Sequence, residues 1–156
     1  MIHIVLYQPE IPPNTGNIIR LCANTGTALH LIKPLGFTLD DARLQRAGLD
    51  YHEWANVQQH ASLEAFMDAI QPDKVYAVST KGRCLYTHVD FTVATTTALL
   101  FGPETRGLPP DVLDSTPPDH VLRIPMQPDS RSLNLSNAVA VILYEALRQQ
   151  QFIGLD

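Results

Sequence analysis

Three polar segments of the 156-residue sequence carry residues whose types and spacing could do chemistry. In the first, residues 14–17 (Asn-Thr-Gly-Asn) lead into a predicted helix that carries Arg20 among apolar neighbours. An arginine near a helix start suits a phosphate-bearing ligand, because its guanidinium is always charged and makes planar, paired hydrogen bonds. An ordinary turn and helix cap would account for Asn14 and Gly16 but not for Arg20. We therefore interpret Arg20 as a group that binds an anionic ligand.

The other two segments are rich in glycine, proline, serine and asparagine. Phe101–Leu108 places two glycines around Glu104 and Arg106, and glycine lets a backbone approach a ligand closely. Ser130–Asn137 has serine or asparagine at five of its eight positions. A helix N-cap needs only one such residue, for which Ser132 is the natural candidate, so we expect a second role for some of the others.

Other catalytic and metal-binding patterns are missing from the sequence. Gly102 and Gly107 have the spacing of a P-loop, but Leu108 and Pro109 follow where lysine and serine or threonine belong. There is no GxGxxG or GxSxG segment, and the six histidines show no HExxH or HxH spacing. We therefore expect no nucleoside triphosphate site, no nucleophile elbow and no metal.

Composition limits the possible partners. The chain is 45% hydrophobic and only 17% charged, which excludes disorder for most of it. Its net charge is −5, whereas a broad nucleic-acid binder is usually basic, so any RNA contact must rest on a local patch. Two cysteines are too few for a disulfide or zinc framework, and no leader or 18-residue apolar run is present. We expect a cytoplasmic protein without a membrane span.

Short apolar runs alternate with helical patterns along the chain. The expected strands are Ile2–Tyr7, Leu29–Ile32, Lys74–Ser79, Thr97–Phe101 and Val121–Ile124. The expected helices are Asn17–Thr25 with Gly26 as its stop, one capped by Asp40 and running to Ala47, one capped by Ser62 and running to Ile70, Pro110–Asp114 and Leu133–Gln150. Tyr51–Val57 is ambiguous, with a short strand as one option. This order predicts one α/β domain over residues 1–156, with a mostly parallel sheet and helices on both faces. Ligands of such sheets bind beyond the carboxyl ends of the strands.

The last predicted helix is apolar on nearly every side over Ala138–Leu143. Such a helix must be buried all round, and in a chain of this size a second copy is the simplest cover. The sequence therefore predicts a homodimer, with Tyr144 and Glu145 as polar groups at the interface.

Taken together, the three polar segments resemble the signature motifs of the SPOUT methyltransferase superfamily, SpoU class. All three motifs occur in order, and the likeness to the small members without an added RNA-binding domain covers nearly the whole chain. The matching residues are Asn14, Gly16 and Arg20; then Phe101, Gly102, Glu104, Gly107 and Leu108; then Ile124, Pro125, Met126, Ser132, Leu133, Asn134, Ala138, Tyr144 and Glu145.

This resemblance implies a C-terminal trefoil knot, S-adenosylmethionine as cofactor, and 2′-O-methylation of cytidine or uridine at nucleotide 34, the wobble position of the tRNA anticodon stem-loop. It implies cofactor contacts by position at Val78, Gly102, Ile124 and Ser132, with Leu133 lining the adenine pocket. Arg20 would position the adjacent phosphate and stabilise the developing alkoxide. Further candidates for orienting the substrate are Asn14, Glu104, Ser136 and Tyr144.

The resemblance also implies that Arg20 of one subunit faces the cofactor of the other. For RNA binding we expect a local positive patch around the cofactor mouth, formed by Arg20, Arg43, Arg46, Lys81, Arg83, Arg106 and Arg131. Three alternatives remain at this point. They are methylation at another tRNA or rRNA position, a non-catalytic RNA-binding module with the same fold, and an enzyme acting on free nucleotides.

Overall fold

A computed structural model describes all residues from 1 to 156, and its centre is a sheet of seven strands. The strand order is β3-β2-β1-β6-β4-β7-β5, and every neighbouring pair is parallel. The carboxyl ends of all strands therefore meet at one edge of the sheet. The strands are β1 (Ile2–Tyr7), β2 (Ala28–Ile32), β3 (Gln58–His60), β4 (Lys74–Val78), β5 (Cys84–Leu85), β6 (Thr97–Phe101) and β7 (Val121–Arg123).

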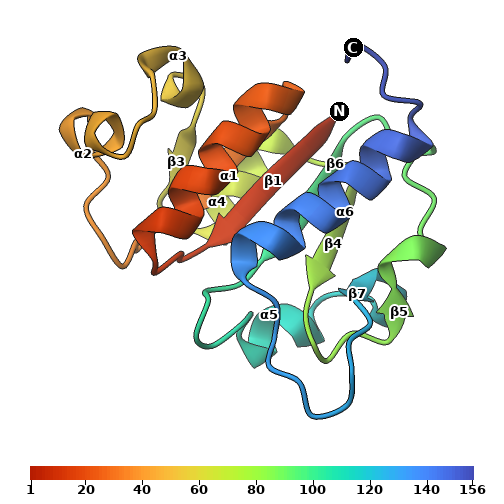
Figure 1. Cartoon of the computed structure of the whole chain (residues 1–156). Coiled ribbons are helices and arrows are strands. Elements are labelled where there is room, and N and C mark those ends of the chain that lie inside the picture. Colours follow the sequence, from red (N-terminus) through yellow and green to blue (C-terminus); the bar gives the residue numbers. More distant parts are fainter.

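Helices cover both faces of this sheet, as the sequence predicted. Figure 1 shows α1 and α6 side by side over one face, and α4 behind the sheet. The helices are α1 (Pro12–Thr25), α2 (Asp41–Arg46), α3 (Tyr51–Trp54), α4 (Leu63–Ile70), α5 (Pro110–Asp114) and α6 (Leu135–Gln149), with short 3-10 turns at Tyr86–His88 and Pro118–His120. None of the helices has the length and apolar character needed to cross a bilayer.

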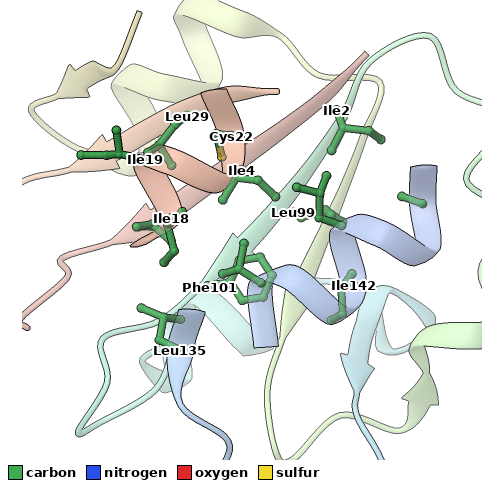
Figure 2. Packing of buried hydrophobic residues seen from close by; sticks show 14 of the residues in the cluster. Ile2, Ile4, Ile18, Ile19, Cys22, Leu29, Leu99, Phe101, Leu135 and Ile142 are labelled. Atoms are coloured by element: carbon green, nitrogen blue, oxygen red, sulfur yellow. The ribbon is translucent and has the colours of Figure 1, made fainter. Parts of the chain in front are cut away.

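Alternating side chains of the strands divide the core into two layers. Ile4, Leu99 and Phe101 point toward α1 and α6, where Ile18 and Ile142 pack against them (Figure 2). The intervening residues point to the opposite face and meet α4 and α5; this second layer contains Val5, Ile32, Phe66, Ala77, Ala98, Leu100, Leu108 and Val112. Successive residues of a strand are thus buried on opposite faces, as a parallel sheet that is covered on both sides requires.

Two helix starts differ from the sequence prediction. α1 begins at Pro12, not at Asn17, because proline lacks only an N–H that the first turn leaves unpaired anyway. The residues expected as a turn are thus helical, and Asn14 is buried. α6 begins at Leu135 rather than at Leu133, and its N-cap is Asn134, not Ser132. The Asn134 side chain accepts a hydrogen bond from the backbone N–H of Ser136 at 2.9 Å.

Other local predictions are confirmed. Gly26 ends α1 in the left-handed region at φ +68°, which favours glycine. The side chains of Asp40 and Ser62 cap α2 and α4 by accepting backbone N–H groups. The ambiguous stretch 51–57 holds α3, and the short strands β3 and β5 at the two edges of the sheet had no sequence prediction.

Within one chain, α6 buries a single stripe rather than its whole circumference. Leu135, Val139, Ile142, Leu143, Ala146 and Leu147 are buried. Val141 and Tyr144 on the outer side are 38% and 45% exposed. Burial on all sides is therefore not achieved by this chain alone, and the second copy that would supply it stays a prediction.

Candidate functional site

A cavity of about 440 Å³ lies beyond the carboxyl ends of β4, β6 and β7. Its walls are the loops that follow these strands and the start of α6. This volume is in the range of small-molecule sites, which is roughly 300–1,000 Å³. All five residues predicted to contact the cofactor line it: Val78, Gly102, Ile124, Ser132 and Leu133.

The loop after β6 folds back on itself so tightly that only glycine fits at its start. A Cβ atom on Gly102 would lie 2.2 Å from the backbone nitrogen of Leu108 and 2.4 Å from the carbonyl carbon of Gly107. Gly107 has φ +67° and donates its N–H to the Pro103 carbonyl at 2.8 Å. At this loop the cavity is therefore bordered by closely packed backbone.

Two glutamates join the loops that follow β1 and β6 through hydrogen bonds. The Glu104 carboxylate accepts the backbone N–H groups of Glu10 at 2.9 Å and Ile11 at 2.7 Å. In return, Glu10 accepts the backbone N–H and hydroxyl of Thr105, at 3.0 and 2.7 Å. Burial raises the pKa of Glu104, although its backbone donors act in the opposite direction. Glu104 borders the cavity, but its oxygens are engaged in holding the two loops together.

Arg20 lies outside this cavity, whereas Asn14 on the same helix lines it. Six residues along a helix correspond to about 9 Å and a rotation of roughly 240°, so the two side chains leave α1 in different directions. The Arg20 Nε donates to Glu53 Oε2 at 2.9 Å, and its Nη2 donates to the Gly48 carbonyl. Hydrogen bonding to Glu53, and then the charge of that carboxylate, raise the pKa of Arg20.

Ser136 and Tyr144, both on α6, are also absent from the cavity wall. The Ser136 hydroxyl donates to Asn134 Oδ1 at 2.6 Å and so belongs to the helix cap. Tyr144 faces outward on the exposed side of α6. Of the five candidate catalytic residues, the structure therefore brings Asn14 and Glu104 to the cavity and leaves Arg20, Ser136 and Tyr144 away from it within one chain.

The basic residues fall into two groups rather than one patch. Lys81 and Arg106 line the cavity, and Arg131 directly precedes the lining residue Ser132. Arg43 and Arg46 lie on α2 and do not line it. In Figure 1, α2 and α3 sit together at one end of the molecule, away from β7 and β5. One chain alone therefore does not gather the predicted basic residues around the cofactor mouth.

Two acidic residues that hold site residues were missed by sequence reasoning. Glu10 is 94 residues from the loop it binds, and no local pattern announces such a partner. Glu53 follows Asp50 by three residues, the spacing of a capping box, which signals a helix start but not a contact with Arg20. No group of three or more His, Cys, Asp or Glu side chains could hold a metal ion.

Comparison with known proteins places these features in a family. Residues 1–144 match the model of the SpoU rRNA Methylase family. The chain is 60% identical to a tRNA (cytidine(34)-2'-O)-methyltransferase of Aeromonas hydrophila, over 99% of this chain and 97% of that protein. It is 56% identical to the Escherichia coli K12 protein of the same name, with the same coverage.

Solved structures agree with this placement. One determined to study 2-OH methylation of C/U34 on tRNA superposes with a TM-score of 0.86 at 47% identity, over 97% of each chain. The SpoU methyltransferase AviRb of Streptomyces viridochromogenes, solved in complex with the cofactor AdoMet, superposes with a TM-score of 0.80 at 26% identity. That match covers 96% of this chain and 60% of AviRb.

Proposed function

Because the chain belongs to the SpoU methylase family, we propose that it methylates the ribose 2′-hydroxyl of cytidine or uridine 34 in tRNA, using S-adenosylmethionine. One observation carries the proposal. The cavity beyond β4, β6 and β7 contains all five expected cofactor residues in a chain whose relatives, at 60% and 56% identity, are tRNA (cytidine(34)-2'-O)-methyltransferases.

The cavity fits the proposed cofactor in size and chemistry. Apolar side chains such as Val78, Ile124 and Leu133 suit the adenine ring, and the backbone of the loop that begins at Gly102 offers hydrogen-bonding groups. Ser132 adds a hydroxyl. When bound, S-adenosylmethionine supplies a methyl group that its sulfonium makes electrophilic, so the chain itself must supply orientation and control of the proton.

Arg20 acts on the RNA side of this reaction. A ribose hydroxyl is a weak nucleophile and must lose its proton as it attacks. Arg20 does not take that proton, because the Glu53 carboxylate raises its pKa further above an already high value. Its guanidinium instead binds the neighbouring RNA phosphate and stabilises the negative charge that develops on the 2′-oxygen, and the phosphate accepts the proton. Holding nucleophile and methyl group in line can contribute about 7–11 kcal/mol.

The active unit is a homodimer in which Arg20 of one chain faces the cofactor cavity of its partner. Arg20 does not line the cavity of its own chain, and its helix α1 packs beside α6. The outer side of α6 exposes Val141 and Tyr144, which a two-fold partner would cover. The same pairing would bring Tyr144 and the basic residues of α2 toward the partner's cavity.

The C-terminal part of the chain forms a trefoil knot in this proposal. A close approach of two segments distant in sequence supports it, since a Cβ atom on Gly82 would lie 2.6 Å from the carbonyl carbon of Leu122. The knot is tested by joining the two ends of the backbone in a crystal structure. A closed curve that simplifies to an unknotted ring would contradict the knot. Because tRNA is its proposed substrate, we propose that the protein works in the cytoplasm.

Mapping of tRNA by mass spectrometry, from cells with and without the gene, tests the activity. We expect the methyl group on nucleotide 34 of some tRNAs to disappear without the gene and to return with the wild-type gene but not with Arg20→Ala. Methylation lost at another position would favour the alternative of a different RNA site. Purified protein that binds tRNA without transferring methyl groups would favour a binding module, and transfer to free nucleosides would favour a small-molecule enzyme.

A further inference from the structure

We propose that Glu53 is a positioning residue that orients the guanidinium of Arg20 for methyl transfer, by holding one edge of it and leaving Nη1 for the RNA. This inference rests on the proposed function and names a further residue that the reaction needs. Glu53 does not line the cofactor cavity, so its effect must pass through Arg20.

The contact is a two-point contact between distant parts of the chain. Arg20 Nε donates to Glu53 Oε2 at 2.9 Å and Nη2 approaches Oε1 at 3.4 Å, across 33 residues of sequence. The Gly48 carbonyl accepts a further hydrogen bond from Nη2. Both partners come from the stretch that runs from the end of α2 into α3, and this stretch packs against α1.

Glu53 is itself held in place, which an orienting group must be. Its side chain is only 9% exposed, whereas that of Arg20 is 50% exposed. Glu53 Oε1 also accepts the backbone N–H of Asp50 at 2.8 Å, at the start of α3. Hydrogen bonds from Arg20 and then from Asp50 lower the pKa of Glu53, so the carboxylate stays charged at neutral pH.

Part of the Arg20 guanidinium remains free to donate hydrogen bonds to a substrate. A guanidinium has five N–H groups in a rigid plane. Nε and Nη2, with three of them, are directed at Glu53 and Gly48. The two hydrogens of Nη1 have no partner in the chain, and the side chain is half exposed. The arrangement fixes the plane of the guanidinium and presents one free end, as preorganised stabilisation of a developing charge requires.

A matched pair of variants of the full-length protein separates this role from a structural one. Glu53→Gln keeps an oxygen that can accept the Asp50 N–H, since glutamine also serves in a capping box, but it loses the charge and turns an amide NH₂ toward Arg20. Asp50→Asn removes the same charge from the start of the same short helix and keeps an N-cap residue, and the Asp50 side chain has no hydrogen bond with Arg20. Steady-state methylation of tRNA and thermal melting are measured for both.

We expect Glu53→Gln to lower kcat by about 10- to 100-fold, the effect of a misplaced catalytic group, with KM for S-adenosylmethionine unchanged. Asp50→Asn should stay within about twofold of wild type, with a melting temperature similar to that of Glu53→Gln. Equal losses in both variants would overturn the proposal, because the cause would then be local charge or helix stability. A Glu53→Gln enzyme as fast as wild type, or faster, would also overturn it.

A double variant tests whether Glu53 works through Arg20. In single-turnover reactions with Arg20→Ala, adding Glu53→Gln should change the residual rate by less than about twofold, since there is no guanidinium left to orient. A further tenfold loss would show that Glu53 acts independently and would overturn the positioning role. Failure of the wild-type protein to methylate tRNA would instead reject the proposed function, so the two failures are distinguishable.

Discussion

The cofactor cavity and the surroundings of Arg20 are built in opposite ways. The cavity is lined by residues of one chain at the carboxyl ends of three strands, with closely packed backbone at the loop that begins at Gly102. Arg20 is a single long side chain on a helix, half exposed, with its direction set by Glu53 and by the Gly48 carbonyl. In the proposed function, the first region holds S-adenosylmethionine, and the second presents one charged group to the RNA.

Under the proposed function, the cofactor side and the RNA side of the reaction therefore lie in separate parts of the chain. The topology of the sheet places β6, β4 and β7 next to one another, so the loops that follow them line one cavity within a single chain. The RNA side has no cavity of its own around Arg20, and its proposed partner site is on a second copy. Substitutions in the two regions should therefore fail in different assays.

Arg20→Ala should produce the largest loss of activity. We expect kcat to fall by about 100- to 1,000-fold, the usual effect of removing one group that stabilises a developing charge. Binding of S-adenosylmethionine, measured by calorimetry, should be unchanged, because Arg20 does not line the cavity. Loss of cofactor binding together with activity would break the separation between the two regions.

A substitution in the cofactor cavity should abolish cofactor binding while leaving Arg20 in place, and it allows a test of the shared site. Gly102 is unsuitable for substitution, since even a Cβ atom would strike the backbone of Leu108. Leu133 lines the cavity on an exposed segment, so Leu133→Trp should abolish cofactor binding while the protein folds and Arg20 stays in place. The same calorimetric titration verifies the loss of binding.

Mixing Leu133→Trp with Arg20→Ala then restores activity if the site is shared. With random assortment, about half of the dimers are mixed and each has one intact site of two, so about a quarter of wild-type activity should return. A site contained within one chain would recover nothing. Mixed dimers must be shown to form, for example with two different affinity tags, before an absence of recovery is held against the shared site.

How much of this the sequence could predict also differs between the two regions. The family resemblance assigned five residues to the cofactor by position, and all five line one cavity because the loops after parallel strands meet at one edge of the sheet. The motif residues near Arg20 were recognised too, but their environment was not. The partner of Arg20 is 33 residues away in a stretch whose local pattern was ambiguous, and contacts of that kind depend on how helices pack rather than on spacing.

The exact starts of the helices also depended on packing and on neighbouring loops rather than on spacing in the sequence. The first helix was expected five residues too late, because proline and asparagine are typical of turns and their position inside a first turn depends on the loop before it. Several neighbouring serine and asparagine residues competed for the cap of α6, and spacing alone could not select Asn134. The seven-strand order was beyond sequence reasoning, since edge strands of two or three residues leave no periodicity.

Lys81→Ala should have a smaller effect, on RNA affinity. Lys81 borders the cavity just after β4, whereas Lys74 begins the same strand at the opposite edge of the sheet. A phosphate contact contributes about one counterion to the salt dependence, so Lys81→Ala should weaken tRNA binding several-fold and reduce the salt slope by about 1. Lys74→Ala should change neither. Equal effects of both substitutions, measured by filter binding from low to physiological salt, would argue against a positive cavity mouth.

A row of three histidines lies in the half of the sheet that is remote from the cavity. His3 Nδ1 is 2.9 Å from His30 Nε2, and His30 Nδ1 is 2.9 Å from His60 Nε2, so the row joins β1, β2 and β3. His30 is fully buried, and its ring packs edge-on against Phe66 of α4, with centroids 4.9 Å apart. Burial, followed by the charges of His3 and His60, lowers the pKa of His30 to about 4.

Acidification should therefore weaken this half of the sheet first. The unfolded chain binds a proton at His30 near pH 6.5, while the folded chain binds it only near pH 4, so between these values the unfolded state holds more protons. The stabilisation is complete above about pH 6.5 and is lost as the pH falls toward 4.

His30→Gln removes this titration but keeps a donor and an acceptor, so its urea midpoint should depend less on pH than that of wild type. At pH 5 the hydrogen-exchange protection factors should fall in β2 and β3 before they fall in β4 and β6, which would leave the cofactor cavity intact while the support of the Arg20 region loosens. Uniform exchange across all four strands would show that the two regions do not differ in stability.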